Sequence, residues 1–207
     1  MDIAITKAGC LILSYLSGSI PFGLILTNTF GNLDIRKIGS GNIGATNVLR
    51  AGNKYLAIAT LLLDMLKGYV PIVLTINFFP ELVYAASLIV FLGHIFPIWL
   101  KFKGGKGVAT YLGVLGALSI HLFLLFIITW IVISLIFKYS SISSIFSSLT
   151  VLVINSIREF ISSIDASISS TQITSSKILF IFFILIIFTH RKNISNLKNK
   201  AEQKIKI

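Results

Sequence analysis

The sequence predicts an all-α, polytopic integral membrane protein with about seven transmembrane helices, for three reasons. Hydrophobic residues make up 55% of the 207-residue chain and charged residues only 12%, and the mean hydropathy is +0.92. Apolar stretches long enough to cross a bilayer alternate with short polar segments. Most of the 18 Lys and Arg residues fall in those polar segments and in the C-terminal tail. An ordinary soluble domain is therefore excluded.

Three predicted spans occupy the first half of the chain, at residues 8–29, 55–78 and 82–100. The first contains Pro21 among small residues, which predicts a kink and close packing against other helices. The second carries Asp64 and Lys67, which share one face because residues three apart are neighbours on a helix.

The second half is less regular, with apolar segments at residues 108–118, 120–137, 139–157 and 177–188. At a rise of 1.5 Å per residue, the first of these covers only about 17 Å of a hydrocarbon core about 30 Å thick. It is therefore either a half-helix inside a protein shell or a span that borrows flanking residues. The segment 139–157 is serine-dense, which predicts a helix that faces other helices rather than lipid. A polar segment, residues 158–176, precedes the last span.

The positions of the cations predict the orientation of the chain. With the N-terminus outside and the C-terminus in the cytoplasm, the inner loops and the tail hold most of the Lys and Arg residues, and only Lys67 lies within the membrane. A version with about five spans, in which the two weakest segments lie at the surface, keeps both ends on the same sides. We expect one integral membrane domain over residues 1–207.

Composition also bears on ligands. The net charge of +11 suits nucleic acid, but the cations lie in short loops between apolar spans, so we expect no nucleic-acid partner. Cys10 is the one cysteine of the sequence, so an internal disulfide is impossible and a cysteine-based metal site is not expected. The three histidines are scattered without paired ligands, which argues against a zinc site.

The longest polar, glycine-dense segment, residues 36–54, separates the first two spans. Glycines let backbone N–H groups converge on an oxygen-rich ligand. Short hydrogen-bonding side chains and cations accompany them, namely Ser40, Asn42, Thr46, Asn47, Arg36, Lys37 and Arg50. This is the chemistry of a phosphate site. An ordinary cytoplasmic loop, in which glycines make turns and cations set the topology, explains the same residues equally well.

A second basic glycine segment follows the third span, and it consists of Lys103, Gly104, Gly105, Lys106 and Gly107. It precedes an apolar helical segment. Free amides, a helix N-terminus and two ammonium groups together predict an anion nest. The alternative is a tight basic turn between two helices.

Several ionisable residues lie within the spans or at their ends. An unpaired charge inside a membrane is costly, so Asp64 and Lys67 need a partner or a polar cavity. They can pair with each other, although Lys67 suits an anionic ligand equally well. His94 stands near a helix end, where a structural role is commoner. His190 closes the last span, with Asn193 one turn on, and it can either position or deprotonate a substrate hydroxyl or complement the helix dipole.

These motifs resemble the bacterial acyl-phosphate:glycerol-3-phosphate acyltransferase family, which is membrane-integral and PlsY-type. The residues that carry the resemblance are 18–23, 39–47, 50, 64–68, 93–97, 102–110, 139–141 and 190–194. Several long motifs in the right order are far more specific than one glycine loop, and they cover most of the chain. The resemblance implies about seven membrane helices with the motifs on the cytoplasmic side, in agreement with the cation pattern.

The resemblance also implies a reaction. Acyl phosphate and glycerol 3-phosphate would give 1-acyl-glycerol 3-phosphate (lysophosphatidic acid) and phosphate, in phospholipid biosynthesis at the bacterial cell (inner) membrane. The residues of the family motifs match here at Ser40, Arg50, Lys106, Ser141 or Ser143, His190 and Asn193. We expect catalytic roles for Ser40, Arg50, His190 and Asn193. We expect substrate contacts from Asn42, Thr46, Asn47, Lys67, His94, Lys103, Gly104, Gly105, Lys106, Gly107, Ser141 and Ser143. The expected partners are the two substrates and the lipid bilayer, with no cofactor, no metal and a monomeric protein.

Two features depart from the family pattern. Lys192 stands where the family usually has a glutamate between the Arg and the Asn of the last motif, and the serine-dense segment looks diverged. The main alternative function is a transporter or channel for a phosphate-containing metabolite, because an intramembrane Lys67 and a broken helix are transporter-like. That alternative predicts polar residues on both sides of the membrane and an internal repeat, and the sequence shows neither.

Overall fold

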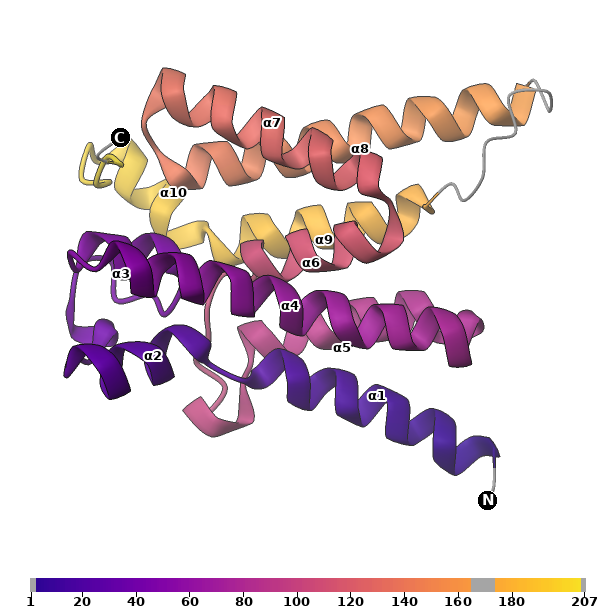
Figure 1. Ribbon diagram of the computed structural model, residues 1–207. Coiled ribbons are helices and arrows are strands. Elements are labelled where there is room, and N and C mark those ends of the chain that lie inside the picture. The colour runs from indigo at the N-terminus through magenta and orange to yellow at the C-terminus, as the bar shows by residue number, and fades with distance from the viewer. Residues whose placement is uncertain (1–2, 165–173, 206–207) are drawn as a thin grey trace. The chain divides into compact units, whose positions relative to one another are not determined.

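The computed structural model describes residues 3–164 and 174–205, which contain helices and no strand (Figure 1). Four helical segments of this part are long and apolar enough to cross a membrane, namely α4 (Lys54–Phe78), the run Pro80–Leu100, α7 (Ile120–Phe137) and α8 (Ser140–Ile164). Two bent pairs raise the number to six, α1 (Ile3–Ser19) with α2 (Phe22–Gly31) and α9 (Ser176–Thr189) with α10 (Arg191–Lys198). The predicted all-α membrane architecture is confirmed. Reaching about seven spans requires α6 (Val108–Leu118) as well, whose 11 residues are too few to cross a bilayer by themselves.

Two compact units make up the chain, Met1–Ala117 and Leu118–Ile207, and each is described by itself. In the first unit, α1 packs against α4 and against α5 (Val83–Ile95), while α2 packs against α4. In the second unit, α8 packs against both α7 and α9.

The predicted kink in the first span is present. The axes of α1 and α2 differ by 42° across a break at Ile20 and Pro21. Proline has no backbone N–H to donate and its ring clashes with the preceding turn, so the helix cannot continue through it. The bend leaves the carbonyl of Ile20 open to a partner from another helix.

Glycines let the helices of the first unit approach closely. A Cβ at Gly18 of α1 would overlap the backbone of α5, and one at Gly93 of α5 would overlap the backbone of α1. Gly68 and Gly113 have the same relation between α4 and α6. Helices inside a membrane gain no hydrophobic driving force from each other, so they depend on such close backbone contact.

The serine-dense segment forms the long helix α8, and its serine face is buried. The buried hydroxyls Ser143, Ser144, Ser147 and Ser148 each donate to a carbonyl three or four residues earlier, which satisfies them inside the membrane. The prediction that this helix faces other helices rather than lipid holds for the serine face, whereas the opposite face exposes large apolar side chains such as those of Phe146 and Phe160. The helix runs to Ile164, beyond the predicted end, and residues 165–173 of the predicted polar segment lie outside the described residues.

The two glycine-rich motifs come to the same end of the first unit. The polar loop contains the short helices η1 (Ile35–Lys37) and α3 (Ala45–Arg50). Beneath it lies a buried apolar cluster of Leu24, Ile35, Ile43, Val48 and Ala57. Leu100, the last residue of η3 (Ile98–Leu100), packs against the same cluster directly before the second motif.

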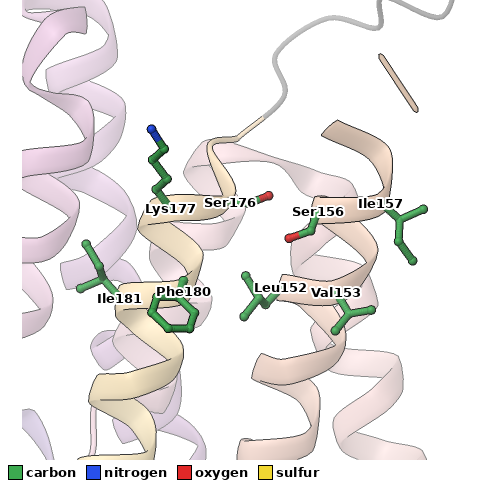
Figure 2. Close-up of a pocket in the computed structure, with 8 residues that line it drawn as sticks. All are labelled: Leu152, Val153, Ser156, Ile157, Ser176, Lys177, Phe180 and Ile181. Carbon is green, nitrogen blue, oxygen red and sulfur yellow. The ribbon is translucent and has the colours of Figure 1, made fainter. Parts of the chain in front are cut away.

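An apolar groove runs between α8 and α9 in the second unit (Figure 2). It encloses about 710 Å³ and is lined by Leu152, Val153, Ser156, Ile157, Ser176, Lys177, Phe180 and Ile181. The lining residues of α9 lie in the first half of that helix, whereas His190 follows its other end, about 14 to 21 Å away at 1.5 Å per residue. The groove is therefore remote from the polar cluster around His190.

Candidate active site

Asn47 organises the first polar loop. Its buried Oδ1 accepts hydrogen bonds from the backbone N–H and the hydroxyl of Ser40, at 2.9 and 3.2 Å. Its Nδ2 lies 3.1, 2.9 and 2.8 Å from the carbonyl oxygens of Ile35, Ile38 and Asn42. The loop itself therefore occupies both polar atoms of the side chain. This geometry favours a role for Asn47 in shaping the site over the predicted contact with substrate.

Two glycines bring Ser40 and Arg50 close to Asn47. Gly39 and Gly41 have φ angles of 56° and 70°, a conformation that favours glycine. A Cβ at Gly39 would overlap Asn47 Oδ1 and lie 3.7 Å from Cδ of Arg50. Arg50 follows Asn47 by three residues on α3, so the two side chains leave the same face. The Ser40 hydroxyl and the Arg50 guanidinium therefore belong to one cluster.

The remaining polar groups of this loop differ in exposure. Asn42 and Thr46, both predicted substrate contacts, are half-buried. The guanidinium of Arg36 donates from Nε and Nη2 to the two carboxylate oxygens of Asp34, at 2.9 and 2.8 Å. These hydrogen bonds lower the pKa of Asp34 from 3.8 to about 2. Because the charge of Arg36 is compensated, Arg50 is the better candidate for a phosphate contact.

The second motif docks onto the end of α5. The N–H of Gly104 donates to the carbonyl of Ile95 at 2.9 Å, and the N–H of Gly105 donates to the carbonyl of His94 at 3.1 Å. These carbonyls belong to the last turn of α5, where intrahelical partners are lacking. The prediction of free amides is therefore wrong at Gly104 and Gly105, because their N–H groups cap α5.

The rest of the second motif leads into α6. Lys103 is exposed, Lys106 is half-buried and Gly107 is buried. Gly107 has a φ of 83°, and a Cβ there would overlap the ring of Phe91. The turn is thus fixed directly before the first turn of α6, where backbone amides and the helix dipole favour an anion. Lys106 remains the candidate for a phosphate-binding cation.

A buried ion pair joins α4 to the kink of the first span. Lys67 Nζ lies 2.6 Å from Asp64 Oδ1, and the two side chains are 2% and 3% exposed. The same ammonium donates to the carbonyl of Ile20 at 2.6 Å and lies 5.7 Å from the centroid of the Phe22 ring. The predicted Asp64–Lys67 pair is confirmed. Since protein groups surround this ammonium, the geometry favours the structural alternative for Lys67 over a substrate contact.

His94 is also enclosed by protein atoms. Its Nδ1 lies 3.1 Å from the hydroxyl of Thr110 and 4.0 Å from Asp64 Oδ1. A Cβ at Gly105 would overlap its Nε2. Both ring nitrogens therefore face the protein, and the structural alternative is again favoured over the predicted substrate contact.

The predicted residues of the second unit gather at one end of it. Asn155 Nδ2 donates to the carbonyl of Thr174 at 2.6 Å and to the hydroxyl of Ser176 at 2.9 Å, which fixes the register of α8 against α9. In this antiparallel pairing the first turn of α8 lies level with the end of α9. Ser141 and Ser143 are therefore at the same end of the unit as His190 and Asn193.

The two serines of α8 differ in their partners. Ser143 donates to the carbonyl of Tyr139 at 2.9 Å. The hydroxyl of Ser141 is buried and has no hydrogen-bond partner among the described residues. A buried hydroxyl without a partner is costly unless a ligand or water completes it. Of the two alternatives that the family motif left open, Ser141 is the better candidate for a substrate contact.

His190 lies at the bend between α9 and α10, and its ring is buried. Nδ1 is 2.8 Å from the carbonyl oxygen of Ile186. A carbonyl can only accept, so this contact assigns the proton of the neutral ring to Nδ1. Nε2 is then the nitrogen that carries the lone pair, which suits it to accept a proton from a hydroxyl.

Asn193 is held by a residue that sequence reasoning missed. Its Nδ2 donates to Glu202 Oε1 at 2.6 Å. The tail folds back further, since the N–H of Ile205 donates to the carbonyl of Lys138 at 2.7 Å. A lone acidic residue in a basic tail was the available signal for Glu202, but nothing local indicates where the tail returns.

The structure offers no cluster for a metal ion in the described ranges, since no three His, Cys, Asp or Glu residues gather there. The family model described as glycerol-3-phosphate acyltransferase matches residues 8–200. The chain belongs to the glycerol-3-phosphate acyltransferase family. Its relatives include the glycerol-3-phosphate acyltransferase of Pelagibacter ubique (strain HTCC1062), which is 54% identical over 194 residues, or 94% of this chain and 95% of the relative. That of Mesorhizobium japonicum is 50% identical over 196 residues and 94% of each chain.

Solved structures of the family agree with this fold. The integral membrane glycerol 3-phosphate acyltransferase PlsY (YgiH), in its glycerol 3-phosphate form, has a TM-score of 0.86 at 32% identity and covers 97% of this chain and 96% of its own. Its lysophosphatidic acid form has a TM-score of 0.83 at 32% identity and covers 96% and 95%. The predicted family resemblance is confirmed, and the chain is a multi-pass integral membrane protein.

Proposed function

We propose that this protein transfers a fatty acyl group from acyl phosphate to the sn-1 hydroxyl of glycerol 3-phosphate. The products are lysophosphatidic acid and inorganic phosphate. The observation that carries the proposal is the family match over residues 8–200. The structural relative with glycerol 3-phosphate and lysophosphatidic acid forms supports the acceptor and the product. The donor is inferred from the family resemblance of the sequence motifs.

Two cations bind the substrate phosphates in this proposal. Arg50 suits a bidentate grip on one phosphate because a guanidinium presents two parallel N–H donors to two oxygens. Lys106, next to the first turn of α6, suits the other as a point charge reinforced by the helix dipole. Ser40 and Ser141 add short hydrogen bonds.

The chemical step needs little beyond positioning. The glycerol hydroxyl oxygen attacks the acyl carbonyl carbon, and the bond from that carbon to the phosphate oxygen breaks. Acyl phosphate is a mixed anhydride whose leaving group is already good, so no covalent acyl-enzyme is required. Proximity and orientation alone supply up to roughly 7 to 11 kcal/mol in well-oriented cases. The hydroxyl proton passes to His190 Nε2 or to a substrate phosphate oxygen, with Asn193 orienting the hydroxyl.

The family resemblance supports a location in the bacterial inner membrane, and the cations set the orientation. We place the N-terminus outside, because the cations then gather in the cytoplasmic loops and tail. The polar motifs accordingly face the cytoplasm, where glycerol 3-phosphate is dissolved. The protein acts as a monomer, and the acyl chain stays within the bilayer.

The proposal is tested by acyl transfer with purified, detergent-solubilised protein. Palmitoyl phosphate is offered with labelled glycerol 3-phosphate, and acyl-CoA and acyl carrier protein serve as parallel donors. We expect labelled lysophosphatidic acid from palmitoyl phosphate alone, without added metal. No product from any donor, by protein that remains folded, overturns the enzyme proposal and favours transport.

A pair of arginine variants tests the phosphate grip. Arg50→Lys keeps the charge but loses the second parallel hydrogen bond, a charged interaction of about 1.5 to 3 kcal/mol, so kcat/KM falls roughly 10- to 100-fold. Arg36→Lys is the matched control in the same loop, since Arg36 is already paired with Asp34, and it leaves kcat/KM unchanged. Equal losses in both variants argue against a specific grip by Arg50.

A further inference from the structure

Four buried side chains form a continuous polar chain across the first unit. Lys67 contacts the carbonyl of Ile20 at the kink and the carboxylate of Asp64, each at 2.6 Å. Asp64 lies 4.0 Å from His94, and His94 lies 3.1 Å from the hydroxyl of Thr110. All four residues are buried, with whole-residue exposures of 2% for Asp64, 5% for Lys67, 4% for His94 and 0% for Thr110.

His94 and Thr110, at the end of this row of polar side chains away from Lys67, hold the second glycine motif. The motif follows η3, packs back onto the last turn of α5 at His94, and ends directly before α6, whose first residue lies two positions before Thr110. On its first side, the backbone N–H of Gly105 donates to the carbonyl of His94, and Gly105 leaves no room for a Cβ against the imidazole. On its second side, Thr110 contacts the same imidazole. His94 therefore holds the turn that carries Lys106 from both sides, through its carbonyl at Gly105 and through its ring at Thr110 of α6.

Apolar side chains of similar volume would fill this space at a lower cost in desolvation free energy. The attraction within a buried ion pair barely offsets the hydration that its two charges lose. Such a pair therefore adds little to stability, and a role in fixing the geometry explains it better. Polar contacts are directional, whereas apolar contacts let neighbouring helices slide. The position of this chain, between the kink and the lysine-bearing turn, is where a fixed geometry matters for a phosphate site.

We propose that Asp64, Lys67, His94 and Thr110 are positioning residues that set the register of residues 103–107 and thereby aim Lys106 at a substrate phosphate. Of the four, His94 contacts the turn at Gly105, and the other three act on the turn through His94 rather than on the substrate. The aim at a substrate phosphate rests on the proposed function, whereas the control of the turn does not. Loss of one of these polar contacts therefore weakens the binding of the substrate whose phosphate Lys106 contacts and leaves the binding of the substrate that Arg50 contacts unchanged.

Thr110→Val is the sharpest test because it removes the hydroxyl and keeps the side-chain shape. Thr75→Val is the matched control, since Thr75 is equally buried in the same unit and its hydroxyl donates back to Pro71 of its own helix. Amide hydrogen exchange at Gly104 and Gly105 is the first readout, and it needs no activity. We expect exchange about 2- to 10-fold faster in Thr110→Val, as the loss of one hydrogen bond predicts, no change at these amides in Thr75→Val, and rescue by Thr110→Ser.

Steady-state kinetics with both substrates is the second readout. In Thr110→Val the KM of one substrate rises by about 2- to 10-fold while the KM of the other is unchanged, and Thr110→Ser restores both. Unchanged exchange at Gly104 and Gly105 overturns the positioning role. Equal rises in both KM values, or equal effects of Thr75→Val, show general loosening and also overturn it. If wild-type protein makes no product, the proposed function fails, and the exchange result still decides whether these residues hold the turn.

Discussion

Replacement of Lys67 by methionine separates the two roles that the sequence leaves open for this residue. Methionine keeps most of the length of the lysine stem but removes the ammonium. That ammonium is 2.6 Å from Asp64 and 2.6 Å from the carbonyl of Ile20, in surroundings where the pair is 2% and 3% exposed. The variant therefore leaves a buried carboxylate without its counter-ion, which costs about 3 to 5 kcal/mol.

The second substitution of the cycle is Asp64→Asn, which removes the charge left behind. In the double variant Asp64→Asn/Lys67→Met no buried charge remains, so we expect it to recover most of the lost stability. Stability is measured as the thermal midpoint and the denaturant midpoint of the detergent-solubilised protein. Reversibility is checked by recovery of the signal on cooling.

The thermal midpoint and the KM together decide between the two roles. A structural pair predicts a low thermal midpoint for Lys67→Met and recovery in the double variant. A substrate-binding Lys67 predicts the opposite pattern, with an unchanged midpoint, a KM raised at least about 10-fold by loss of a charged contact, and no recovery in the double variant. The second pattern refutes the structural assignment.

Three further predictions follow from the two polar clusters. Ser141→Ala raises the KM of one substrate by about 2- to 10-fold. It does not lower the thermal midpoint, because the hydroxyl of Ser141 has no protein partner in the described part of the chain. Ser143→Ala is the control, and equal effects of the two variants argue against a specific contact by Ser141. Asn47→Ala lowers the free energy of unfolding by at least about 2 kcal/mol, since it leaves several buried loop groups unsatisfied, and an unchanged denaturant midpoint contradicts that. Folding lowers the pKa of Asp34 from 3.8 to about 2. The ionised carboxylate therefore contributes its full stabilisation above about pH 4, and this stabilisation is lost as the pH falls through about 2. We expect the difference in unfolding free energy between wild type and Asp34→Asn to be constant from pH 5 to pH 8 and to shrink below pH 4, and a difference that grows on acidification contradicts the assignment.

Most of the fold is predictable from the sequence because apolar length and breaker residues are local signals. The second span and the span before Lys138 match α4 and α7 closely, and Pro21 marks the bend in the first span. The short segment before Ser119 is a helix of 11 residues, as its length indicates. The extension of α8 to Ile164 was not predicted, and one contact there, from the backbone N–H of Ser176 to Glu159 Oε2, is supplied only by the tertiary structure.

The site is less predictable, because residue type indicates chemistry but not which atoms are already satisfied. Asn47 has the composition of a ligand contact, yet five hydrogen-bonding distances to its own loop account for its amide. Gly104 and Gly105 look like an anion nest, yet their amides cap α5. Glu202 reaches Asn193 from nine residues away, and no local pattern specifies that return.

In the proposed mechanism the enzyme binds and aligns two substrates and forms no covalent acyl-enzyme. A single-turnover experiment tests it directly, with enzyme in excess over doubly labelled palmitoyl phosphate, carrying label in the acyl chain and in the phosphate. Without glycerol 3-phosphate, we predict no release of phosphate above the rate without enzyme and no acyl label on the denatured protein. Addition of glycerol 3-phosphate then releases phosphate and lysophosphatidic acid together. A burst of phosphate in the absence of acceptor, matched by acyl label on the protein, would contradict the direct-transfer account.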